Sequence, residues 1–221
     1  MNIAPLSAIN LLIKKGKQIL LNLSCDMMTT DYLKRLLETL KEKNMRNLFV
    51  ILGESYDAKT SDFKNTSQLI KYVREQTGNY FCIGVAGFPG CSDDKMMHLK
   101  EKVESGADFI ITQAFFDKEI FRSFTDKCKE NNINVPILPG VFPFESLKQL
   151  THFINLCKIK VSDDLLQNVN DKEAFNETSQ IMKQLIQELN SHCTVTHFHF
   201  YTLNKLQRIN EFCTLCLPKK I

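Results

Sequence analysis

The chain has 221 residues, of which 43% are hydrophobic and 24% are charged, and its formal net charge is +3. This is the composition of an ordinary globular domain, and so small a net charge gives no reason to expect a nucleic-acid partner. No apolar run approaches the roughly 18 residues that a membrane span requires, so we expect no membrane partner either.

Two kinds of apolar segment alternate along the chain. Short continuous runs are typical of strands that are buried on both faces, and six of them occur, at residues 18–24, 47–52, 80–86, 108–112, 135–141 and 197–203. Amphipathic stretches with helical spacing lie between them, at residues 32–40, 67–75, 96–103, 120–128, 147–157 and 178–190. In the segment 147–157, the stripe consists of Leu147, Leu150, Ile154 and Cys157, and Phe153 lies beside it.

This order of elements predicts an α/β fold with about six βα units. Parallel strands need connections of this length, and a spacing of roughly 25–35 residues per unit fits a TIM-barrel-like (β/α)8 fold. A doubly wound sheet is the alternative. No glycine-rich phosphate fingerprint follows any of the runs, which weighs against a dinucleotide-binding sheet.

In a barrel of this type, functional residues lie at the carboxyl ends of the strands. The predicted ends carry an amide (Gln113), a carboxylate (Glu54), a cation (Lys205) and aromatic residues that include Phe88 and Phe116. Such a set suits a flat ligand that is partly apolar and partly polar. The sequence therefore predicts that these strand ends line a pocket for a heteroaromatic molecule.

The cysteine pattern gives little support to a metal site. Cys213 and Cys216 form a CTLC pair, but no second pair and no nearby histidine pair accompanies it. We therefore predict no metal ligands. The N-terminal segment has no basic region ahead of its short apolar run, as a signal peptide would, so we expect a cytoplasmic protein with free thiols.

Three long motifs resemble the methylenetetrahydrofolate reductase family. They are "GADFIITQAFFD", "VPILPGVFPFESLKQL" and "HFHFYTLNK", and the resemblance is collinear from about residue 8 to residue 210. It implies a (β/α)8 catalytic barrel that binds FAD and reduces 5,10-methylenetetrahydrofolate to 5-methyltetrahydrofolate. NAD(P)H supplies the hydride in this family, which serves one-carbon and methionine metabolism. The resemblance also implies that residues 1–221 are one partial catalytic domain without a regulatory domain.

The resemblance implies substrate-binding roles for Gln113, Phe153 and Lys205. Gln113 stands at the family's folate-contacting glutamine, and Phe153 stands where some members place an aromatic ring against the substrate. Lys205 replaces an arginine that would hold the glutamate tail of the folate. Lysine keeps the charge but loses the two-pronged hydrogen bonding of a guanidinium group.

The resemblance also implies a set of FAD-binding positions. Glu54 replaces an aspartate that tunes the flavin and stabilises the cationic iminium form of the substrate, so Glu54 is the expected catalytic residue. Asn22 stands in place of a family histidine. The side chain of Glu54 is one methylene longer than that of the family's aspartate, so its charge lies in a slightly different place. The full expected cofactor set is Asn22, Gly53, Glu54, Ala86, Phe88, His98 and Lys102.

By this resemblance, the chain begins in the helix after the family's second strand, and a strand with a glutamate that acts as general acid is missing. An incomplete barrel has open edges, which a homo-oligomer or a partner chain would cover. Two functions therefore stay open from the sequence. One is the reductase reaction, and the other is that of an inactive family remnant that acts as a folate-binding or flavin-binding protein or as a regulatory partner.

Overall fold

The computed structural model describes residues 9, 12–13, 18–159, 161, 165–166, 174–193, 195 and 197–216. The chain divides into two compact units. Unit 1 comprises Met1–Ala86 and Met97–Ile110, and unit 2 comprises Gly87–Met96 and Ile111–Ile221. The expectation of one domain over residues 1–221 stays a prediction.

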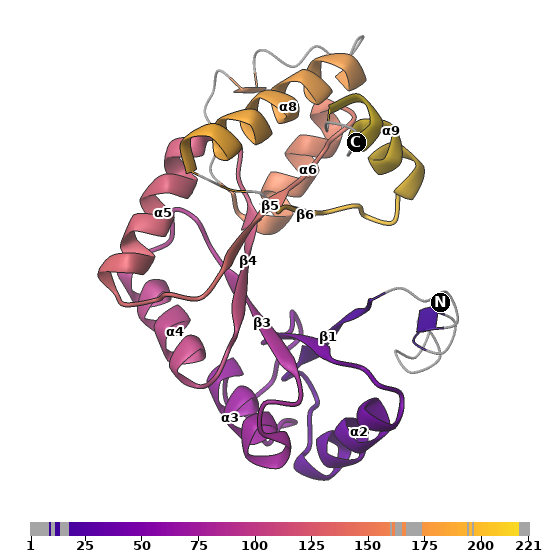
Figure 1. The fold of residues 1–221 in the computed structure, drawn as a ribbon, viewed down its shortest axis with the longest axis vertical. Coiled ribbons are helices and arrows are strands. Elements are labelled where there is room, and N and C mark those ends of the chain that lie inside the picture. Colours follow the sequence, from indigo (N-terminus) through magenta and orange to yellow (C-terminus); the bar gives the residue numbers. More distant parts are fainter. Residues whose placement is uncertain are drawn as a thin grey trace. The chain divides into compact units, whose positions relative to one another are not determined.

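Unit 1 alternates strands and helices (Figure 1). Its elements are β1 (Leu20–Ser24), α2 (Thr30–Glu42), β2 (Asn47–Ile51), α3 (Thr66–Thr77), most of β3 (Cys82–Gly87), most of α4 (Asp93–Glu104) and the start of β4 (Phe109–Ala114). Each of these elements overlaps a strand or helix that the apolar pattern predicts.

The core of unit 1 combines one face of its strands with the apolar stripes of its helices. Its buried residues include Leu23, Leu48, Val50, Ile83 and Val85 from the strands and Leu33, Leu37, Leu40, Leu69, Ile70 and Val73 from the helices. The opposite strand face is open at several positions, where Leu20 is 36% exposed and Asn22 and Cys82 are exposed. The prediction that the strands are buried on both faces is therefore wrong for β1 and for the start of β3.

Arg74 ties together the segments that lead into β3 and β4. Its guanidinium group donates to the carbonyl oxygens of Phe81 (2.7 Å) and Gly106 (2.7 Å) and pairs with the Asp108 carboxylate at 2.6 Å. The same carboxylate oxygen accepts a hydrogen bond from the Ile83 amide at 2.7 Å. These contacts hold the segments before β3 and β4 together within unit 1.

Unit 2 contains the end of β4 and the remaining elements. These are α5 (Lys118–Glu130), β5 (Ile137–Val141), α6 (Leu147–Cys157), α8 (Ala174–Cys193), β6 (His199–Phe200) and α9 (Leu206–Cys216). Helix α8 packs against α5 and α9 (Figure 1). The core is rich in aromatic residues, and its buried members include Phe115, Phe121, Phe142, Phe144, Phe153 and Phe212. The predicted strand 197–203 is reduced to the two residues of β6.

The strands follow one another in the order β1-β2-β3-β4-β5-β6. The β1–β2, β2–β3 and β5–β6 pairs are parallel. A doubly wound sheet reverses its strand order at a switch point, whereas a (β/α) barrel adds each strand beside the last. The predicted α/β fold, TIM-barrel-like and built from about six βα units, is therefore confirmed.

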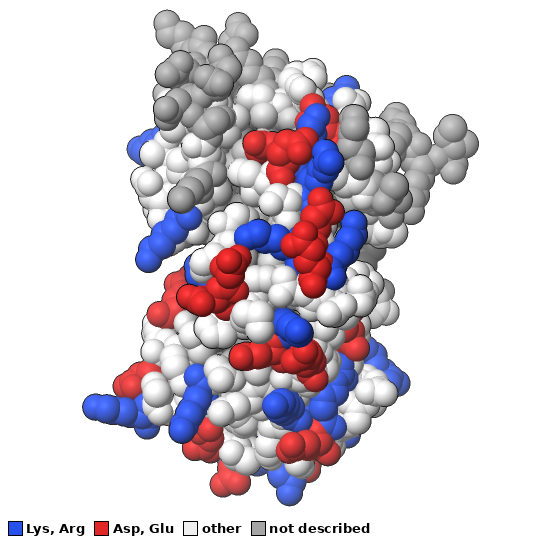
Figure 2. Space-filling model, turned by 90° about the vertical axis from the view of Figure 1, so that its left-hand side faces the viewer, with Lys and Arg blue, Asp and Glu red and all other residues white. Residues whose placement is uncertain are grey.

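On the face shown in Figure 2, acidic and basic side chains are interspersed, as the net charge of +3 leads one to expect. Of the helices among the described residues, none combines the length and the hydropathy that crossing a membrane requires.

Candidate functional site

The carboxyl ends of β1 and β2 meet at Gly53. This glycine has a φ of +100°, and a Cβ atom there would lie 2.8 Å from the Cβ of Asp26. The amide of Cys25 donates to the Ile51 carbonyl at 3.0 Å, which joins the same two segments. A larger residue at position 53 would collide with Asp26, so this position requires glycine. The expected contact of Gly53 with the flavin stays a prediction.

Glu54 follows Gly53 and is exposed. Within the part of the chain that the structure describes, no hydrogen bond or ion pair holds its carboxylate. The structure therefore places the predicted catalytic carboxylate at the end of β2 with its oxygens directed to no protein partner. Its role stays a prediction.

Asn22 lies in the middle of β1, because the strand continues to Ser24. It pairs in register with Phe49, which pairs in turn with Gly84. The ring of Phe109 covers Gly84 so closely that a Cβ atom there would overlap it. Asn22 therefore lies inside the strand, on the open strand face that also carries Phe49 and the half-buried Ala86, two residues after Gly84.

His98 and Lys102 are one turn apart on α4 and therefore share a helix face. His98 is exposed, and Lys102 is half-buried. Burial raises the pKa of the Cys25 thiol to about 11, while a hydrogen bond with Thr66 and the positive charge of Lys102 act in the opposite direction. Since Cys25 directly follows β1, Lys102 carries a positive charge near the carboxyl end of that strand.

Phe88 is the one member of the predicted cofactor set that belongs to unit 2. Its ring is partly exposed, and the Lys95 ammonium nitrogen lies 5.5 Å from the ring centroid. This geometry is that of a cation–π contact at the surface.

The carboxyl end of β4 is fixed by Thr112. Its hydroxyl oxygen accepts a hydrogen bond from the Gly140 amide at 2.9 Å, and its carbonyl oxygen accepts one from the Tyr201 hydroxyl at 2.9 Å. A Cβ atom at Gly140 would overlap the Thr112 carbonyl oxygen and would lie 2.6 Å from the Tyr201 ring. Burial raises the pKa of Tyr201 to about 12, so its hydroxyl remains a donor.

Gln113 follows Thr112 and points to the other face of the strand, because successive side chains alternate. It is half-buried, and no hydrogen bond within the described residues engages its amide. A rigid strand end therefore presents an amide that is able to donate to and accept from a ligand.

Phe153 belongs to the packed face of α6. It is 3% exposed, its ring stacks on Phe142 with centroids 3.8 Å apart, and the Tyr201 ring lies 6.1 Å away. The buried residues of α6 are Leu150, Phe153 and Ile154, so the placement of Phe153 outside the apolar stripe is wrong. Its expected contact with substrate stays a prediction.

Lys205 forms an ion pair that the sequence did not predict. Its ammonium nitrogen lies 2.9 Å from one Glu145 oxygen, and the Arg208 Nε lies 3.5 Å from the other. Leu203 and Asn204, just before Lys205, have φ values of 45° and 62°. Neither Glu145 nor Arg208 stands in a recognisable pattern, so only the fold brings the three charged groups together.

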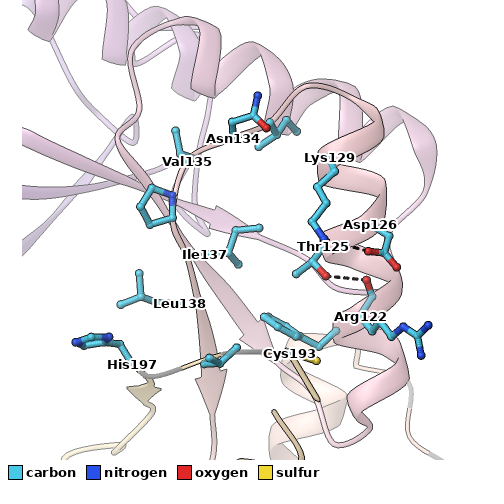
Figure 3. Close-up of a pocket in the computed structure, with 14 residues that line it drawn as sticks. Arg122, Thr125, Asp126, Lys129, Asn134, Val135, Ile137, Leu138, Cys193 and His197 are labelled. Atoms are coloured by element: carbon cyan, nitrogen blue, oxygen red, sulfur yellow. Dashed lines mark hydrogen bonds and ion pairs between the residues drawn. The ribbon is translucent and has the colours of Figure 1, made fainter. Parts of the chain in front are cut away.

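A cavity of about 950 Å³ in unit 2 lies at the opposite, amino-terminal ends of β5 and β6 (Figure 3). Side chains of α5, among them Thr125 and Lys129, line one side, and Ile137 and Leu138 line another. None of the predicted site residues lines it. Of the His, Cys, Asp and Glu residues that the structure describes, no three are grouped to hold a metal ion, and the Cys216 side chain lies outside the described residues.

The sequence model of the family described as methylenetetrahydrofolate reductase matches residues 8–216. The chain belongs to the methylenetetrahydrofolate reductase family. It is 33% identical over 215 residues to methylenetetrahydrofolate reductase 2 of Schizosaccharomyces pombe, and this match covers 83% of the chain and 33% of the relative. It is 29% identical over 211 residues to the 5,10-methylenetetrahydrofolate reductase of Buchnera aphidicola, covering 90% of the chain and 70% of the relative.

The chain thus spans about a third of the length of the first reductases of the family that it matches. Among solved structures, a Clostridium thermocellum protein that binds two copies of 5-methyl-5,6,7,8-tetrahydrofolic acid has a TM-score of 0.71 and 18% identity. The similarity covers 98% of the chain and 78% of that protein. At this identity the similarity establishes the fold.

Proposed function

We propose that the chain takes part in the reduction of 5,10-methylenetetrahydrofolate to 5-methyltetrahydrofolate with FAD and NAD(P)H. The observation that carries this proposal is the family match over residues 8–216, nearly the whole chain. The folate-binding Clostridium thermocellum protein with the same fold supports a folate as the ligand.

Unit 1 carries the residues that fit the flavin. Gly53 allows close approach of the backbone, Lys102 offers a positive charge for phosphate, and Glu54 offers an unpaired carboxylate at the end of β2. When bound, FAD supplies the hydride-transfer chemistry, and the protein contributes orientation and electrostatics. Glu54 stabilises the positive charge of the iminium form of the substrate by Coulomb attraction.

Unit 2 carries the residues that fit the folate. The Gln113 amide both donates to and accepts from the pterin ring, whose edge presents donors and acceptors side by side. Thr112, Gly140 and Tyr201 hold the strand end in place, which keeps the amide oriented before the ligand arrives. Lys205 attracts the carboxylates of the glutamate tail.

The first experiment measures flavin and folate binding separately. The purified chain is incubated with FAD, freed of excess by gel filtration and examined for the visible absorption of bound flavin. The bound flavin is then reduced with NADH or NADPH without oxygen, and its reoxidation by 5,10-methylenetetrahydrofolate is followed. A chain that binds folate but no FAD contradicts the reductase proposal and supports a folate-binding role.

Replacing Gln113 tests the folate half of the site. The change Gln113→Ala is expected to slow reoxidation by the folate by about ten- to a hundredfold, since it removes hydrogen bonds to the substrate. Reduction by NAD(P)H is expected to stay unchanged. Gln187→Ala, which removes an exposed amide on α8, is the matched control. If the Gln113→Ala variant and the control are reoxidised by the folate at equal rates, the folate-binding role of Gln113 is contradicted.

A further inference from the structure

Glu145, Lys205 and Arg208 form a charge cluster at the carboxyl ends of β5 and β6. Glu145 bonds to Lys205 through one oxygen at 2.9 Å and to Arg208 through the other at 3.5 Å. Arg208 also pairs with Glu211 at 3.0 Å. The two cations are therefore matched by two carboxylates within the protein itself.

Glu145 is held in place independently of the two cations. Its backbone amide donates to the Gln149 side-chain oxygen at 2.6 Å, and the backbone amide of Gln149 donates to the Ser146 hydroxyl oxygen at 3.1 Å. These bonds hold the backbone of Glu145 at the start of α6, whereas Lys205 and Arg208 belong to the segment of α9. The side chain of Glu145 is 24% exposed, and those of Lys205 and Arg208 are about half exposed.

A ligand has access to the two cations. A cavity of about 500 Å³ is lined by Asn204, Lys205, Leu206, Gln207, Arg208 and Glu211. A carboxylate entering it meets both positive groups, but each is already engaged by Glu145. An entering anion gains only the difference between its own attraction and that of Glu145.

We propose that Glu145 is an internal counter-anion that the carboxylates of the ligand must displace from Lys205 and Arg208, so that it lowers the affinity for the ligand's anionic tail. The inference rests on the proposed function, because it takes the glutamate tail of a folate as the competing anion. A tail with one glutamate offers two carboxylates, whereas an oligo-γ-glutamyl tail offers more of them. Because the same two ion pairs must be broken whatever the tail length, Glu145 lowers the affinity for short and long tails alike.

The test replaces Glu145 by its uncharged isostere. In Glu145→Gln, the affinity for 5-methyltetrahydrofolate with one glutamate is expected to rise by about two- to fivefold, the range that corresponds to loss of one surface ion pair. The affinity for the triglutamate form is expected to rise by a similar factor, because the same two ion pairs no longer have to be broken. Isothermal titration calorimetry measures both.

Glu119→Gln is the matched control, because it removes the same charge from α5, where Glu119 pairs with Arg122 at 3.6 Å. Its affinities are expected to equal those of the unmodified chain. An equal rise in both variants, or no rise in Glu145→Gln, overturns the inference. In the double variant with Lys205→Met the gain from Glu145→Gln is expected to be smaller, because only Arg208 is then left to be released, and a general change in stability does not produce this coupling.

A second probe separates this inference from the proposed function. If no folate binds to any variant, the proposed function fails, and tri-γ-glutamate without a pterin is then titrated into each variant. Tighter binding by Glu145→Gln than by the unmodified chain supports the role of Glu145 on its own. Equal binding of the peptide by both contradicts it.

Discussion

At the scale of single residues, burial sets the charge state of His199 and Tyr201. The two rings lie edge to face with centroids 4.8 Å apart. Burial lowers the pKa of His199 and raises that of Tyr201 to about 12, so both side chains are neutral at physiological pH. Neutral partners suit a strand end whose hydrogen bonds must not change with small shifts in pH.

His199 makes the stability of unit 2 depend on pH. Because its pKa in the folded state lies below the ordinary value of about 6.5, the unfolded chain binds more protons between these two values. The stability that comes from keeping His199 neutral is therefore fully present above about pH 6.5, and it is lost as the pH falls through the folded pKa of His199. We expect the urea concentration at the midpoint of unfolding to decrease as the pH is lowered from about 7.5 to about 5.5.

In His199→Gln, this decrease of the urea midpoint is expected to be smaller. His197→Gln, which changes an exposed histidine two residues away, is expected to keep it. A pH dependence that is identical in both variants contradicts the assignment to His199.

The sequence predicts single residues well where chemistry restricts the choice. A glycine just after a strand, as at Gly53, is typical of a tight backbone conformation, and the structure has a φ of +100° there. Glu145 carried no such signal, because its partners Lys205 and Arg208 are 60 residues or more away in the chain. An ordinary surface glutamate acquires a role only when the fold brings distant charges to it.

At the scale of elements, α6 depends on the stack of Phe153 on Phe142. Truncating a fully buried phenylalanine costs about 3–5 kcal/mol of folding free energy. We expect Phe153→Ala to lower the free energy of unfolding by this amount, measured by urea denaturation. Phe153→Leu, which keeps most of the volume, is expected to cost less than about 1.5 kcal/mol.

Leu156→Ala is the control for this prediction. Leu156 lies on the same helix but is 62% exposed, so the expected change is within about 0.5 kcal/mol. A cost for Phe153→Ala as small as that of the control contradicts the packing role of the ring.

The errors made from sequence at this scale have physical causes. The stripe predicted for α6 was drawn too narrow, because an apolar face of at least about 100° also includes Phe153, three residues after Leu150. The apolar run 197–203 yields a strand of only two residues, since Lys205 bonds back to the Thr202 carbonyl and turns the chain into α9. Periodicity finds elements, but hydrogen bonds within a turn decide where they end.

At the scale of the whole molecule, each unit has its own core. Cys25 is buried in unit 1 and Cys128 in unit 2. Burial raises the pKa of Cys25 to about 11 and that of Cys128 to about 12, so about one thiol in ten thousand or fewer is ionised near pH 7. Partial burial and the Asp108 charge also raise the pKa of Cys82, but its side chain is exposed, whereas those of Cys25 and Cys128 are buried. We expect a thiol reagent to modify Cys82 first in the native protein, as peptide mass spectrometry will show.

In Cys82→Ser, the fast phase of modification is expected to disappear, while Cys25 and Cys128 react only as their surroundings open. Modification of Cys25 as fast as that of Cys82 contradicts the burial. The chain thus contains two natural reporters, one in each unit. Following them at rising urea concentrations will tell whether the two units melt together or one after the other, with no label added to the sequence.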